Sequence, residues 1–221
     1  MKNSVVVLLS GGLDSSTVLY IEKEKYKCNC LIFDYGQRHS RELKSAQKIA
    51  ISAGCNYKTI KIFLPWGGSS LIDKSKKIPH NKIKNIENPQ QIPSTYVPAR
   101  NTIFLSYALS FAETIGAKKI FIGANAVDFS GYPDCRPQYY KNFNKLISVA
   151  ISAVKNGGIK IEVPLLYKTK KEIVKLAVKL KVPLGLTWSC YAGGKKPCGK
   201  CDSCILRAKG FAQADKKDPT I

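Results

Sequence analysis

A continuous apolar run, residues 5–9 (VVVLL), is typical of a strand buried on both faces of a parallel sheet. This run and four further short segments rich in apolar residues alternate along the chain with segments whose apolar residues recur at helical spacing. They predict strands over residues 5–9, 30–34, 57–64, 119–122 and 159–163. The intervening segments predict helices over 14–25, 41–53, 99–116, 139–154, 170–180 and 204–214. This alternation predicts an α/β fold with a doubly wound, five-stranded parallel sheet, Rossmann-like, whose ligands bind at the carboxyl ends of the strands.

Two segments of the chain differ from this regular pattern. The segment 65–98 holds five prolines and no clear period. Long irregular segments in compact domains are usually functional, so we expect it to cover a substrate or to form an interface. The helix over 99–116 has apolar residues on every face, among them Phe104, Leu105 and Phe111, and is therefore predicted to be buried.

Length and charge narrow the class of protein. With 221 residues and 44% hydrophobic residues, the chain can build one globular domain with a small appendage. Its net charge is +21, but the lysines spread from Lys2 to Lys217, which favours a solvated basic surface over direct nucleic-acid binding. No apolar run approaches the roughly 18 residues of a membrane span. The run at 5–9 is shorter than a signal-peptide core of about 7–15 residues, so we expect a cytoplasmic protein without a membrane partner.

The loop after the first predicted strand, residues 10–16 (SGGLDSS), has the composition of an anion site; we call it the phosphate loop. Gly11 and Gly12 permit a tight turn and a close approach of the backbone to a ligand. Consecutive amides and the N-terminus of the following helix attract a phosphate, and Asp14 is expected either to cap that helix or to help hold magnesium. A G-x-x-x-x-G-K match at 194–200 is followed by Cys201 instead of Ser or Thr, so we reject a Walker A loop there.

Four of the eight cysteines crowd near the C-terminus: Cys190, Cys198, Cys201 and Cys204. The two-residue gaps between the last three let successive thiolates face one cation, and four thiolates suit a closed tetrahedral zinc site. An iron–sulfur cluster or two disulfides are the alternatives. We expect structural zinc in a segment 186–221, appended to an α/β domain over 1–185. Cys28 and Cys30, which flank the second predicted strand, are expected to be core residues.

Four further segments sharpen the functional prediction: 34–39 (DYGQRH), 97–102 (VPARNT), 123–137 (GANAVDFSGYPDCRP) and 186–191 (LTWSCY). The phosphate loop resembles the pyrophosphate-binding signature of the N-type ATP pyrophosphatases. Together with the four segments it resembles the QueC (ExsB) family, the 7-cyano-7-deazaguanine synthases of queuosine biosynthesis. The resemblance implies an adenine nucleotide alpha hydrolase-like fold and a homodimeric carbon–nitrogen ligase. It further implies that 7-carboxy-7-deazaguanine and ammonia become the nitrile, with ATP and Mg²⁺, through adenylated carboxylate and amide intermediates.

The matched segments also imply site residues. Nucleotide binding is expected at the phosphate loop, its flanks and two more distant residues: Leu9, Ser10, Gly11, Gly12, Leu13, Asp14, Ser15, Ser16, Thr17, Val18, Leu19, His39 and Arg136. The catalytic candidates are Asp14, Arg100, Asp128 and Asp134. Arg100 would meet the substrate carboxylate or the α-phosphate, whereas Asp128 and Asp134 would read the guanine-like edge or hold Mg²⁺. His39 is equally compatible with a structural role, and the candidate stacking aromatics are Phe129, Tyr132 and Trp188.

Two other functions stay open at this point. The basic charge fits a tRNA-modifying, thiolating pyrophosphatase, although no RNA-binding appendage is evident. A zinc-stapled nucleotide-binding regulator would bind ATP without releasing AMP. The source of ammonia is open as well, since the sequence contains no glutaminase domain.

Overall fold

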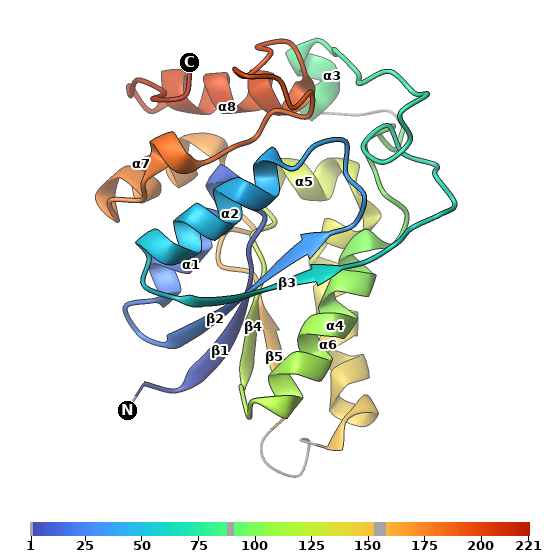
Figure 1. The fold of residues 1–221 in the computed structure, drawn as a ribbon, viewed down its shortest axis with the longest axis vertical. Coiled ribbons are helices and arrows are strands. Elements are labelled where there is room, and N and C mark those ends of the chain that lie inside the picture. Colours follow the sequence, from blue (N-terminus) through green and yellow to red (C-terminus); the bar gives the residue numbers. More distant parts are fainter. Residues whose placement is uncertain (1, 88–90, 153–157) are drawn as a thin grey trace.

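The computed structural model describes residues 2–87, 91–152 and 158–221, and its centre is a parallel β-sheet (Figure 1). The strands are β1 (Ser4–Leu8), β2 (Lys27–Asp34), β3 (Asn56–Lys61), β4 (Lys119–Phe121) and β5 (Lys160–Glu162). They run parallel in the order β3-β2-β1-β4-β5, which confirms the predicted doubly wound α/β fold. The chain proceeds from β1 to β3 and then returns to β4, so the carboxyl ends of β1 and β4 form the switch point where such sheets bind ligands.

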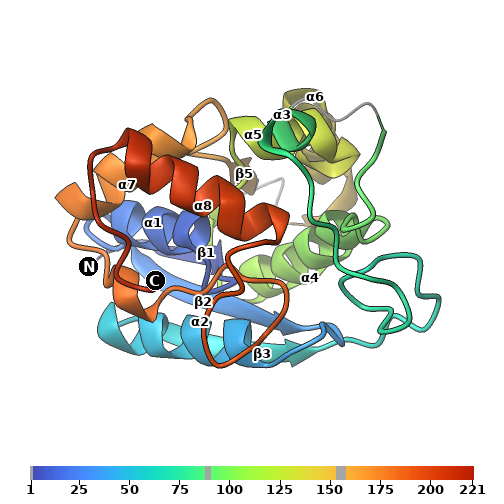
Figure 2. The ribbon, with the colours of Figure 1, turned by 90° about the horizontal axis from the view of Figure 1, so that it is seen from above.

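Helices cover both faces of the sheet. One face carries α1 (Leu13–Glu22), α2 (Arg41–Ser52) and α7 (Lys170–Lys179), and the other carries α4 (Arg100–Thr114) and α6 (Pro137–Ala150). Alternate residues of β1 point to opposite faces, since Val5 and Val7 join the core under α1 while Val6 and Leu8 join the core under α4. The last helix, α8 (Asp202–Gln213), packs against α7 (Figure 2).

The helix α4 corrects one prediction. Its buried stripe includes Leu105, Ala108 and Ala112, which face the sheet. Ser106 and Tyr107, on the opposite side, are exposed. Because α4 lies in the outer layer of the fold, the full burial expected from its apolar composition was wrong.

Some elements and boundaries also differ from the prediction. The unpredicted helical elements are α3 (Ile83–Glu87), α5 (Ala126–Gly131) and the 3-10 turns Pro133–Cys135 and Leu184–Leu186. The helix α6 begins at Pro137, whose fixed φ suits a first helical position; positions 153 and 154, at its predicted end, lie outside the described residues. Cys28 and Cys30 lie inside β2, and both are buried as predicted. In the described ranges, no helix is long and apolar enough to cross a membrane.

Asn81 and α3, which belong to the segment 65–98, contact the C-terminal segment. Asp202, the first residue of α8, accepts two hydrogen bonds from Asn81, one from its backbone amide at 3.0 Å and one from Nδ2 at 2.8 Å. The helix α3 contacts both α5 and α8. Residues far apart in the sequence therefore meet at the carboxyl edge of the sheet (Figures 1 and 2).

A buried ion pair anchors the end of the chain to α8. Arg207 donates from Nε to Oδ2 of Asp218 at 2.6 Å and from Nη2 to Oδ1 at 3.0 Å, and the two side chains are 5% and 6% exposed. We expect Arg207→Ala to lower the free energy of unfolding by about 3–5 kcal/mol, because Asp218 would stay buried without its partner. The control is Lys119→Ala, which breaks a half-exposed pair with Glu162 and should cost under about 1 kcal/mol. Urea unfolding compares the two variants, and equal losses would contradict this account.

Candidate functional site

The phosphate loop lies at the switch point, between β1 and α1. Gly11 has a φ of +83°, and a Cβ there would lie 2.5 Å from the backbone nitrogen of Ala46 and 2.6 Å from the carbonyl oxygen of Glu42. Only glycine tolerates so close an approach of α2. Gly12 is the N-cap of α1 and makes no side-chain capping bond, which leaves the start of the helix to an anion. Asp14 is therefore not the helix cap, one of its two predicted roles.

Contacts from three parts of the chain hold the loop in shape. Ser15 Oγ lies 2.9 Å from Ser10 Oγ and accepts the amide of Ser10 at 3.1 Å. The carbonyl of Gly11 accepts the amide of Trp188 at 2.9 Å and the hydroxyl of Ser45 at 3.1 Å. The C-terminal segment and α2 thus fix the backbone of the phosphate loop.

We expect Gly11→Ala to abolish nucleotide binding and to lower the free energy of unfolding. The cost is about 2–5 kcal/mol, the sum of left-handed backbone strain and overpacking. Gly54 is the matched control, because its φ is +67° but nothing lies within 4 Å of its Cβ position. Gly54→Ala should cost only the strain, about 1–2 kcal/mol. Chemical unfolding and calorimetric titration with ATP measure both effects, and a Gly11→Ala protein that binds ATP normally would refute the close-packed loop.

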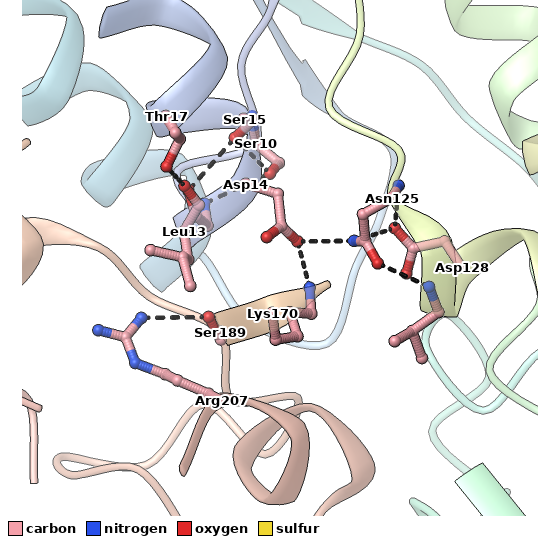
Figure 3. Close-up of polar contacts among 12 residues, drawn as sticks. Ser10, Leu13, Asp14, Ser15, Thr17, Asn125, Asp128, Lys170, Ser189 and Arg207 are labelled. Carbon is pink, nitrogen blue, oxygen red and sulfur yellow. Dashed lines mark hydrogen bonds and ion pairs between the residues drawn. The ribbon is translucent and has the colours of Figure 1, made fainter. Parts of the chain in front are cut away.

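Asp14 contacts Lys170 and is joined to Asp128 through Asn125 (Figure 3). Lys170 Nζ, at the start of α7, lies 2.5 Å from Asp14 Oδ2. Asn125 donates from Nδ2 to Asp14 Oδ2 at 3.2 Å and to Asp128 Oδ2 at 2.6 Å. It also forms a capping box with Asp128 at the start of α5. The other oxygen of Asp14, Oδ1, is buried and has no hydrogen-bond partner among the described residues, so it is available to a ligand.

Burial and neighbouring charges tune this network. Burial raises the pKa of Asp128 to about 6, and the charge of Lys170 opposes the shift. Burial alone would lower the pKa of Lys170, but the Asp14 and Asp128 carboxylates outweigh it, and the pKa is raised. Lys170 therefore keeps its positive charge beside the phosphate loop at neutral pH. A second cation lies close by, since Arg207 Nη1 donates to Ser189 Oγ at 3.2 Å (Figure 3).

A cavity of about 280 Å³ extends from the phosphate loop to Arg100, at the start of α4. The Arg100 guanidinium carbon lies 5.7 Å from the ring centre of Tyr35 and 5.8 Å from that of Phe104. Its Nη1 donates to the Tyr35 hydroxyl at 3.4 Å, while its Nε is buried with no partner in the described parts of the chain. A cation with a spare donor between aromatic rings suits a flat, anionic ligand.

Two further features complete the cavity wall. Tyr96 and Tyr132 stack with ring centres 6.1 Å apart and planes inclined by 25°. Asp134 is buried, and its Oδ2 accepts the backbone amide of Asn101 at 3.1 Å; burial raises the pKa of its carboxyl. One oxygen of Asp134 therefore holds the start of α4, a structural role that the sequence did not indicate.

The cavity brings together most of the predicted site residues. Those that line it are Leu9, Ser10, Gly12, Leu13, Asp14, Ser15, Arg100, Asp128, Tyr132, Asp134 and Trp188. Val18 and Leu19 are core residues, and Thr17 bonds within its own helix. Arg136 is exposed, and the ring of His39 lies 6.4 Å from that of Trp188. None of these five lines the cavity, so their predicted contacts with nucleotide stay predictions; the side chain of Phe129 lies outside the described residues.

The four clustered cysteines converge as predicted. The sulfur atoms of Cys190, Cys198, Cys201 and Cys204 all lie within 4.8 Å of one another. Four thiolates bound to zinc at about 2.3 Å would lie about 3.8 Å apart, a spacing within reach of small shifts. The amides of Ala192 and Cys198 donate to Cys190 Sγ at 3.4 and 3.3 Å. These donors stabilise a thiolate, so the cluster fits a tetrahedral metal ion.

Three charged residues that line the cavity were not predicted as site residues: Glu42, Lys170 and Arg207. Lys170 stands in an amphipathic helix with Lys171 and Lys175, a pattern typical of a solvated surface. The one sequence feature that could have indicated Lys170 as a site residue is its position at the start of a helix that follows a strand. Glu42 comes three residues after the DYGQRH segment, and nothing in the sequence around it indicates a site residue. It lines the cavity because α2 packs closely against the phosphate loop.

Comparison with known proteins identifies the family. Residues 4–215 match the model of the family described as "Queuosine biosynthesis protein QueC". A Picrophilus torridus protein named 7-cyano-7-deazaguanine synthase is 56% identical, over 96% of this chain and 89% of that protein. Proteins of the same name from Thermoplasma acidophilum and Prochlorococcus marinus are 49% and 55% identical, over 99% and 96% of this chain and 91% and 95% of theirs. The chain with this phosphate loop, aromatic-lined arginine and cysteine cluster belongs to the QueC family of queuosine-biosynthesis proteins.

Proposed function

We propose that this chain is the ATP-dependent ligase that converts 7-carboxy-7-deazaguanine and ammonia into 7-cyano-7-deazaguanine. Membership of the QueC family and relatives of that name along nearly the whole chain support the proposal. The observation that carries it is the single cavity that joins the phosphate loop to Arg100. One end suits the phosphates of ATP and the other a flat carboxylate, and these are the two reactants of an adenylation.

At the phosphate end, positive charge stabilises the leaving group. As the substrate oxygen attacks the α-phosphorus, negative charge develops on pyrophosphate. Lys170 and the amides at the start of α1 face the place where this charge appears. Asp14 Oδ1 and Asp128 are the oxygens that would hold Mg²⁺, which supplies further neutralisation of phosphate charge when bound.

At the other end, Arg100 orients the substrate. The unpaired Nε donor of Arg100 would hold the carboxylate toward the α-phosphorus, and the stacked Tyr96 and Tyr132 offer flat faces to a purine-like ring. Much of the rate would come from holding the two reactants in line. The same arrangement serves twice, because first the carboxylate and then the amide oxygen must become a phosphate leaving group before the nitrile forms.

Three further features belong to the proposal, and of these only the homodimer rests on the resemblance to the family. They are zinc in the cysteine cluster, a homodimer and a cytoplasmic location. The cluster is the one with structural support, since four converging sulfur atoms and their amide donors suit zinc. An all-cysteine site leaves no open position on the metal, so we assign it a structural role.

Mass spectrometry of the reaction tests the proposed function. Protein loaded with zinc is mixed with 7-carboxy-7-deazaguanine, ammonium, Mg²⁺ and ATP, and we expect the nitrile together with AMP and pyrophosphate. AMP without nitrile would redirect the search for substrate toward tRNA. Absence of AMP from folded, metal-loaded protein would overturn the enzyme assignment and favour a nucleotide-binding regulator.

A further inference from the structure

Four acidic side chains line the cavity, and three of them are engaged by neighbours. Asp14 contacts the Lys170 ammonium, Asp128 accepts a hydrogen bond from the Asn125 side chain, and Asp134 accepts one from the backbone amide of Asn101. The fourth is Glu42, in the first turn of α2. Over the residues that the structure describes, no donor bonds to its carboxylate and no cation forms an ion pair with it.

The surroundings of Glu42 place it between the two ends of the cavity. Its backbone carbonyl lies against Gly11 of the phosphate loop. Burial raises the pKa of its carboxyl to about 7; the charge of Arg100 opposes this shift, and the Cys190 thiolate adds to it. Glu42 is therefore an unpaired carboxylate, able to take up a proton near neutral pH, beside the place where carboxylate and α-phosphate would meet.

The proposed reaction needs a group of this kind. At neutral pH most ammonia is protonated, as other amines are, and the ammonium ion has no lone pair with which to attack a carbonyl. An unpaired carboxylate both attracts the ammonium ion and can remove its proton.

We propose that Glu42 binds the ammonium ion, accepts one of its protons and presents ammonia to the adenylated carboxylate. This inference rests on the proposed function. In the step, one proton passes from ammonium to the Glu42 carboxylate, and the freed lone pair forms the carbon–nitrogen bond. The carbon–oxygen bond to AMP breaks, and its electron pair leaves with AMP. The nitrogen then loses a second proton to solvent, which leaves the neutral amide.

The variant Glu42→Gln tests this role because it keeps the side chain's shape and removes its charge. Two assays separate the half-reactions. Exchange of labelled pyrophosphate into ATP, dependent on 7-carboxy-7-deazaguanine, reports adenylation, and we expect it to stay within about threefold of the wild type. Amide formation with ammonium should fall by about 10²–10⁴-fold, the usual effect of removing a general base. Glu24→Gln, at an exposed carboxylate that does not line the cavity, is the control and should leave both rates unchanged.

Hydroxylamine distinguishes proton transfer from a structural effect. It is largely unprotonated at neutral pH, so it needs no base to become a nucleophile. The Glu42→Gln protein should therefore form the hydroxamate at nearly the wild-type rate. Its melting temperature should not fall, since an unpaired, partly buried charge is removed. Normal amide formation with ammonium, an equal loss with hydroxylamine, or loss of pyrophosphate exchange from folded variant would each overturn the role of Glu42. Absence of substrate-dependent exchange in the wild type would instead overturn the proposed function, and the role of Glu42 with it.

Discussion

Lys170→Met lowers the rate of substrate-dependent pyrophosphate release by about 10²–10³-fold and leaves the protein folded. Lys170 Nζ lies 2.5 Å from Asp14 Oδ2, beside the phosphate loop. Removing one group that stabilises developing charge usually lowers the reaction rate by about this factor. Methionine retains a long apolar side chain, so packing of the half-buried stem against α8 is kept. The loss should therefore appear in the rate and not in the binding of 7-carboxy-7-deazaguanine.

The neighbouring Lys171 is a matched control for this prediction. It occupies the same helix and is exposed to solvent, so Lys171→Met should keep the wild-type rate. Coupled detection of pyrophosphate measures both variants, and circular dichroism checks that they are folded. Similar rates for the two variants would refute the assignment of Lys170 to the leaving group.

We expect Cys201→Ser to abolish metal binding at the proposed zinc site and to destabilise the whole chain. Cys201 is buried at the centre of the cluster, and loss of one thiolate opens a closed tetrahedral site. We expect the zinc content to fall from one ion per chain to almost none. The free energy of unfolding should fall by about 4 kcal/mol or more, because metal binding and folding of such a segment are coupled. For a chain of this size that corresponds to a loss of about 8–16 °C in Tm.

Elemental analysis and thermal unfolding check this expectation. Cys55→Ser is the control, since Cys55 is half-buried and lies outside the cluster, and the variant should keep its metal and nearly all its stability. A chelator should lower the Tm of the wild type toward that of Cys201→Ser. Full stability of a metal-free Cys201→Ser protein would show that the cluster does not hold the C-terminal segment in place.

The sequence predicts the sheet well, because its signal is local. Strand β1 is an almost continuous apolar run, and the phosphate loop and the cysteine cluster are each short in sequence. The failures come from tertiary placement. The apolar surface of α4 resembles a fully buried helix, yet only one side of it faces the sheet. Lys170 resembles the solvated lysines around it until the topology brings α7 beside Asp14, 156 residues earlier in the chain. The periodicity of the sequence does not predict the unpaired carboxylate of Glu42 either, since its neighbours include residues of α4 and the phosphate loop.

The hydrogen bond between Trp188 and Gly11 has a consequence for synthesis of the protein on the ribosome. Strand β1 and the phosphate loop emerge more than 170 residues before Trp188, which lies in the segment that fixes the loop's backbone. A nascent chain therefore carries an unfinished nucleotide site throughout most of its translation. That site is complete only once Trp188 has left the ribosome and can bond to Gly11. We therefore expect a chain that is terminated before Trp188 to bind ATP poorly.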